Sequence, residues 1–371
     1  MMKRIISAIV MLLCIQLLSP IACADELDEF TENISQSAEE GLPENVKDEL
    51  SSMDISLENP ESLSEISVYD ILDSAKKSLQ EGFVNPVSLL AKLVGILLLC
   101  SIASSMCSGE KETDRVYETI CVLSVITLLI DTLGRVCSSL IEMLSSLSGF
   151  MSTYLPVYIS VTTASAGQAT ASASGITLLA LSEVVSLCAN KLLPLVCSVM
   201  LACSIAQSIS PMRDYSVTVA IRKFINKVIV FASTLFIGVI SVSGIVGSSA
   251  DTVAVRCAKF TASSFVPVIG SSVAEAYTTV KGSLSLLRSA TGAFGILVVV
   301  LIALRPVLVS VGLSVVIYVA KAVAELFSLK GPKAFLGGVG EMMSVIMTSS
   351  ILLSLVFVIS TAVLMLSCVS I

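Results

Sequence analysis

The sequence contains no histidine and no tryptophan, and only 14% of its 371 residues are charged. Without histidine, the chain lacks the commonest metal ligand and the side chain that most often carries protons near neutral pH. It also shows no phosphate-binding glycine loop, no dinucleotide fingerprint, no nucleophile elbow and no cysteine cluster with metal-ligand spacing. These absences predict a protein that is not an enzyme and that uses no cofactor or metal.

Hydrophobic residues dominate the composition. They make up 55% of the chain, and its mean hydropathy is +0.94. A soluble domain usually has about a quarter of its residues charged, because its surface must be hydrated. The composition therefore predicts an all-α, polytopic membrane protein.

The charges divide the chain into two unequal parts. Residues 25–85 hold 17 acidic residues and three lysines, a net charge of −14, whereas Pro86 onward holds 17 basic and 12 acidic residues, a net charge of +5. We therefore expect an acidic segment over residues 25–85, followed by a slightly basic multi-span membrane domain over 86–371.

The first 24 residues have the parts of a signal peptide. Lys3 and Arg4 precede the apolar stretch Ile5–Leu18, and Ala22 and Ala24 stand at the expected cleavage site. This pattern predicts that the acidic segment is exported. An uncleaved anchor is an alternative interpretation.

One amphipathic helix is expected within the acidic segment. Ser62–Glu65 matches a capping box, and the apolar residues that follow as far as Phe83 fall mostly on one helical face. Such a helix lies on the membrane, binds a partner or serves as a solvated spacer.

Six apolar runs are long enough to cross a membrane, which takes about 20 residues. Two of them are longer, so seven or eight crossings stay open. The run that contains Arg305 and Pro306 is either one kinked helix or a tight hairpin. The six runs are Pro86–Cys107, Val116–Leu133, Ile176–Ala206, Val228–Gly247, Gly292–Phe327 and Met342–Val369.

The distribution of basic residues predicts the orientation, because inside loops carry an excess of lysine and arginine. With Asp25 outside, the inside loops hold Lys111, Arg115, Arg213, Arg222, Lys223, Lys227, Lys330 and Lys333. The expected outside loop over residues 248–289 also contains four basic residues, which runs against this rule.

The membrane domain contains a weak internal repeat. Residues 117–216 and 228–333 each combine a proline-containing motif with a long apolar run, and a final span follows over 342–369. Tandem units are common in channels and transporters.

Charged residues within or beside the apolar runs are the candidate functional positions. Each costs about 2.5–3.5 kcal/mol at the bilayer centre unless protein or water surrounds it. Two of the predicted contacts are i,i+4 pairs, which join Asp131 to Arg135 and Lys321 to Glu325. We expect a solute path, a contact between subunits or a structural polar contact. The candidates are Asp131, Arg135, Glu183, Lys191, Glu275, Arg305, Lys321 and Glu325.

Two further features lack chemistry of their own. Residues 161–175 have almost no bulky side chain, which suits close helix packing, the lining of an aqueous path or an external loop. The eleven cysteines include no C-x-x-C motif, and we expect them to be small buried hydrophobic residues.

The order of these features resembles a known family. A leader and an acidic segment precede Asn85–Pro86, and residues 251–253, 265–270 and Arg305–Pro306 follow in turn. In this order the chain is similar to the stage III sporulation protein AE family of endospore-forming bacteria.

The resemblance implies a multi-pass protein of the mother-cell membrane around the forespore. It implies partners among the other proteins of the stage III A sporulation operon and stage II sporulation protein Q. Together these would form a channel complex for forespore maintenance and late forespore gene expression. The family supplies no catalytic residues.

Two other functions fit the residues themselves. A secondary transporter would bind a small solute at the intramembrane charges, and a non-conducting scaffold would act only through assembly. The channel subunit, the transporter and the scaffold would all lie in a lipid membrane, and none of them would bind nucleic acid. Each is compatible with an oligomer of identical chains.

Overall fold

The computed structural model describes residues 36, 41–52, 86–106, 111–165, 167–210, 215–265 and 270–366. Within these ranges the backbone is almost entirely helical and contains no strand. Six helical segments are long and apolar enough to cross a membrane, which confirms the predicted class of fold. The expected signal peptide and the amphipathic helix over 62–83 lie outside the described residues.

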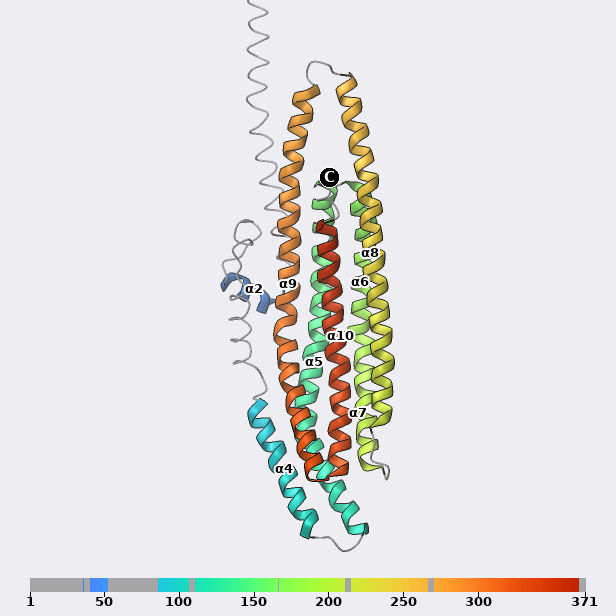
Figure 1. The fold of residues 1–371 in the computed structure, drawn as a ribbon. Coiled ribbons are helices and arrows are strands. Elements are labelled where there is room, and N and C mark those ends of the chain that lie inside the picture. The colour runs from blue at the N-terminus through green and yellow to red at the C-terminus, as the bar shows by residue number, and fades with distance from the viewer. Residues whose placement is uncertain are drawn as a thin grey trace, which may run out of the picture.

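The helices run alternately down and up one elongated bundle (Figure 1). Pro86 begins the first of the six candidate spans, and a short helix precedes it in sequence. In chain order the elements are α2 (Glu44–Ser52), α4 (Pro86–Met106), α5 (Lys111–Ser165), α6 (Gln168–Leu187), the π-helical turn η2 (Cys188–Leu192), α7 (Leu193–Ile209), α8 (Ser216–Phe265), α9 (Gly270–Leu326) and α10 (Lys330–Leu366).

Helix α10 forms the centre of the bundle. It packs against α9, α8, α7 and α5, while α4 lies outside against α5 and α9. Phe335, Met343 and Phe357 of α10 are fully buried in this core. The last helix of the chain therefore holds together the helices that precede it.

The bundle is much taller than a bilayer is thick. Helices α5, α8 and α9 contain 55, 50 and 57 residues. At 1.5 Å per residue they measure about 75–85 Å, whereas the hydrocarbon core of a bilayer is about 30 Å thick. The ends of α8 and α9 project farthest from α4 (Figure 1). The described residues within 248–289 continue these two helices instead of forming the expected loop, and their place outside the membrane stays a prediction.

The long apolar runs form continuous helical segments. Helix α9 passes through Arg305 and Pro306 without a turn, so the hairpin alternative is wrong. Helices α6 and α7 join through η2, which contains Lys191 and lies just before Pro194.

The α5–α6 turn is closed by a carboxylate from α8. Asp251 accepts hydrogen bonds from the backbone N–H groups of Ala169 (3.1 Å) and Thr170 (2.8 Å). Gly167 has φ 138°, and any side chain there would strike the Asp251 carboxylate. The stretch over 161–175 is therefore a closely packed helical corner rather than a loop.

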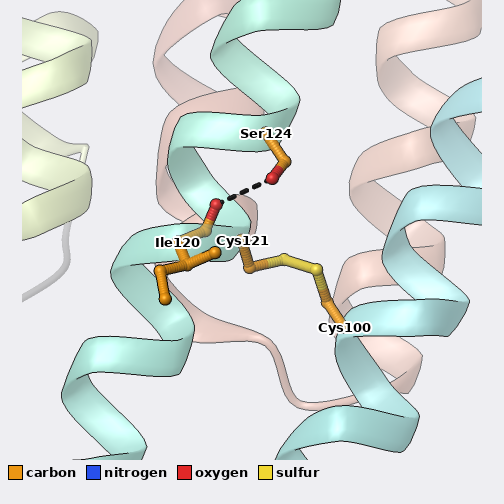
Figure 2. The surroundings of a disulfide bond; sticks show 4 residues. All are labelled: Cys100, Ile120, Cys121 and Ser124. Atoms are coloured by element: carbon orange, nitrogen blue, oxygen red, sulfur yellow. Dashed lines mark hydrogen bonds between the residues drawn. A yellow bond between two sulfur atoms is a disulfide. The ribbon is translucent and has the colours of Figure 1, made fainter.

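Cys100 of α4 and Cys121 of α5 form a disulfide, with their Cα atoms 5.8 Å apart (Figure 2). The expectation that these two cysteines are separate hydrophobic residues is wrong. The reason is that α4 and α5 run antiparallel from the short linker between them, which places the two thiols opposite each other. Among the other described cysteines, Cys197 is buried and Cys257 is exposed.

Part of the acidic segment packs on the bundle. Leu42, Val46 and Leu50 of the α2 region are buried in the main hydrophobic core. Gly41 lies against Thr153 of α5, where a β-carbon would approach the threonine side chain to 2.8 Å. The segment thus contacts the part of α5 that is remote from the α4–α5 linker.

Asp251→Ala is predicted to destabilise the protein. The change removes the acceptor for two amide groups at the start of α6, and loss of such a cap costs about 0.5–2 kcal/mol. We expect a lower apparent Tm in detergent for Asp251→Ala and a smaller decrease for Asp251→Asn, which keeps one acceptor oxygen. Equal Tm values for Asp251→Ala and the unmodified protein would contradict this role.

The disulfide is tested by mass-tagging of thiols in the denatured, unreduced protein. We expect Cys100 and Cys121 to react with a maleimide tag only after reduction, whereas Cys257 reacts without it. Cys100→Ser should release Cys121 for tagging, which serves as the internal control. Tagging of both cysteines before reduction would exclude the bond.

Candidate functional site

A cavity with a mixed polar and apolar lining lies between α5 and α9. Its volume is about 280 Å³, and Pro43, just before α2, contributes to its wall. The apolar lining includes Val136, Met143 and Ile302. The polar lining consists of Arg135, Ser139, Glu142, Ser146 and Arg305.

Local helix geometry places these groups in the cavity. The four polar residues of α5 are spaced by four, three and four positions, so they share one face of the helix. On α9, Pro306 has no N–H to donate to the carbonyl of Ile302, four residues earlier. Both of these residues line the cavity.

Charged side chains of both signs stand at the cavity. Arg135, Glu142 and Arg305 line it. Arg135 also bonds Asp131 at 2.9 Å, which confirms the predicted i,i+4 pair, although both side chains are more than half exposed. Charge-assisted hydrogen bonds of this kind are stronger than those between neutral groups.

A second polar cluster joins α8 to α10. Arg222 forms a direct ion pair with Glu341, and its side chain is 33% exposed against 18% for the glutamate. Arg222 Nη1 also lies 3.5 Å from Ser344 Oγ. The sequence suggested a basic loop for Arg222, but the residue lies in the second turn of α8.

The predicted pair between Lys321 and Glu325 is wrong. Lys321 Nζ lies 3.1 Å from the hydroxyl of Tyr215 and 4.6 Å from the centre of its ring. Glu325 instead bonds Lys333 at 2.6 Å. The reason is the tight turn between α9 and α10, which folds Lys333 back against the end of α9.

The other candidates do not join the cavity. Glu183 and Lys191 are exposed on the outside of α6 and η2. The side chain of Glu275 lies outside the described residues. Of the eight candidates, the structure brings Arg135 and Arg305 together in the cavity, with Asp131 beside it.

Three charged residues were missed by sequence reasoning. Glu142 lies nine residues after Leu133, where the predicted span ends. Glu341 lies just before Met342, where the predicted final span begins. Arg288 of α9 is only 3% exposed, and its Nε and Nη2 have no hydrogen-bond partner among the described residues. Glu142 was detectable from its spacing of seven residues from Arg135, which places both on one helical face.

Comparisons with known proteins find one matching family model and a curated relative. A family model described as stage III sporulation protein AE matches residues 56–368. Stage III sporulation protein AE of Bacillus subtilis (strain 168) is 22% identical over 244 residues, which is 64% of this chain. The matched region spans 60% of that relative's length. No solved structure matches the chain.

Separate loss of Arg222 or Glu341 is predicted to destabilise the bundle. Each change leaves the other charge largely buried without its partner, which we expect to cost about 1.5–3 kcal/mol given the partial exposure of Arg222. Arg222→Glu combined with Glu341→Arg should recover part of the loss. Apparent Tm values in detergent for both single variants and the exchange test this, and additive losses in the exchanged protein would contradict the pairing.

Proposed function

Because the chain belongs to the stage III sporulation protein AE family, we propose that it is a membrane subunit of the channel complex between mother cell and forespore. In this role it supports forespore maintenance and late forespore gene expression. It is a multi-pass protein of the mother-cell membrane, with its acidic N-terminal segment on the exported side.

The height of the bundle is the observation that carries this proposal. Helices of 50–57 residues extend about 45–55 Å beyond a 30 Å hydrocarbon layer. With the α4–α5 linker on the mother-cell side, the projecting ends of α5, α8 and α9 lie in the space between the two membranes. A solute carrier with its site at the membrane midplane does not need this extension.

The acidic segment lies on the same side as the projecting ends. Its described part packs beside the cavity through Leu42 and Pro43. Carboxylates at Glu44 and Asp48 remain on the surface near one another, one helical turn apart. We propose that this region meets other proteins of the complex, among them those of the stage III A operon and stage II sporulation protein Q.

The cavity between α5 and α9 gives the subunit a second task in the complex. Arg135 and Arg305 line a space of about 280 Å³. A conducting subunit would use them as part of a polar path. A secondary transporter for a small solute is the alternative that this cavity favours, and a pure scaffold would not use it.

The first experiment is an in-frame deletion in the native spore-former. Late forespore transcription reporters and heat-resistant spores are measured after engulfment, with the unmodified gene restored as control. We expect engulfment to be completed while late forespore expression and spore yield fall. Normal sporulation of the deletion strain would overturn the proposal.

Arg305→Ala, introduced into the complementing gene, separates a conducting role from a scaffold. We expect normal protein levels with spore yield reduced at least tenfold, because the cavity loses one of its two guanidinium groups. Arg305→Lys should retain part of the function, since it keeps the positive charge but not the planar donor fork. Ser138→Ala on the exposed face of α5 is the control, and full function of Arg305→Ala would favour the scaffold.

A further inference from the structure

Helix α8 carries an exposed apolar stripe along nearly its whole length. The helix packs mainly on α6 and α10, so its opposite face is left uncovered within the described residues. Phe224, Phe231 and Phe260 on this face are 70–74% exposed. The stripe comprises Val217, Phe224, Val228, Phe231, Leu235, Val239, Val242, Ile245, Val246, Val253 and Phe260.

The stripe is too long to be covered by lipid alone. Its continuous part, from Val217 to Val246, covers 29 residue steps, or about 44 Å, which exceeds the hydrocarbon thickness of about 30 Å. Beyond it, Val253 and Phe260 alternate with the exposed Ser249 and Arg256. A tilt that brought the continuous part into the lipid would exceed about 45°, whereas membrane helices tilt by at most about 40°. Contiguous apolar surface outside lipid marks a protein contact.

The spacing of the stripe suits contact with another helix. Phe224, Phe231, Gly238 and Ile245 follow one another at intervals of seven, with Val228, Leu235 and Val242 between them at intervals of seven as well. Such alternation of four and three residues forms the seam of a helix pair. A β-carbon on Gly238 would meet no atom within 4 Å, so this point of the seam is open for close approach.

Charges at equal heights identify a complementary face on the chain itself. Lys223 and Lys227 flank the stripe and are exposed. The Arg222–Glu341 ion pair places the start of α8 beside Glu341 of α10. Val122 lies against Gly331 of α10, and α5 and α10 run in the same direction, so Asp131 reaches the height of residue 340. Asp131, 74% exposed, therefore lies level with Lys223.

The two faces belong to helices that do not pack against each other. Helix α5 packs on α6, α9 and α10, and α8 packs on α6 and α10, with the central helix between them. Among the described residues, Asp131 pairs with Arg135 and not with Lys223. Adjacent copies that stand side by side in one membrane can bring Lys223 to Asp131, because both charges keep the same depth.

We propose that the α8 stripe binds the Asp131-bearing face of α5 in a second copy of this chain. The contact is head-to-tail, since it joins two different surfaces, and repetition of such a contact around an axis normal to the membrane produces a ring. The apolar seam supplies the contact area, and the pairing of Asp131 with Lys223 and Lys227 fixes the register. This inference does not depend on the sporulation role.

The contact is tested by photocrosslinking in membranes of a non-sporulating host. Two forms of the full chain with different epitope tags are co-expressed, and benzoylphenylalanine replaces one native phenylalanine. We expect Phe231→benzoylphenylalanine and Phe260→benzoylphenylalanine to give a product that carries both tags. Phe236 is half-buried and faces a pocket formed by α6, η2, α7, α8 and α10, so it is the matched control and should give none.

Charge exchange then tests which surface is the acceptor. Asp131→Lys, or Lys223→Glu with Lys227→Glu, should each reduce the doubly tagged product at least fivefold, and the combination of all three should restore it. Arg135→Gln also removes the intrahelical pair of Asp131 but keeps its charge, so the product should persist. Absence of a doubly tagged product from both exposed positions, or its insensitivity to all charge changes, would overturn the proposal.

Discussion

A backbone that crosses lipid must satisfy its own hydrogen-bonding groups, and in this protein that requirement governs the whole architecture. Within the bilayer, helices satisfy these groups by internal hydrogen bonds. Helices α5, α8 and α9 are longer than the bilayer is thick, so they continue outside it. Outside the lipid, these helices still need apolar partners to remain packed. The central helix α10 supplies many of them, with Phe335 near its start and Phe357 towards its end.

Much of this fold could be predicted from the sequence because lipid solubility leaves a strong signal. The six candidate spans and the Asp131–Arg135 pair follow from composition and helical spacing alone. The extent of α5 could not be found in the same way, because mean hydropathy falls after Leu133 while the helix continues to Ser165. Its buried residues do carry a readable pattern, alternating by four and three: Leu129, Leu133, Val136, Leu140, Met143, Leu147, Phe150 and Tyr154.

The polar contacts show where sequence spacing stops being informative. Lys321 and Glu325 are ideally spaced for pairing, yet each has a partner from another element, because α9 ends between Tyr215 and Lys333. The Arg222–Glu341 pair and the Cys100–Cys121 bond join residues on different helices. Such contacts depend on the order of helices around α10, which no local pattern encodes.

The carboxylate of Asp251 also has a consequence for biosynthesis. It serves amide groups at Ala169 and Thr170, 82 and 81 residues earlier in the chain. When the ribosome has completed α5 and α6, the corner between them still lacks its acceptor, and it closes only once α8 has been made and inserted. Assembly of this bundle therefore departs from the order of synthesis. The α5–α6 hairpin is made early, but two of its backbone N–H groups gain their acceptor only after α8 has been inserted.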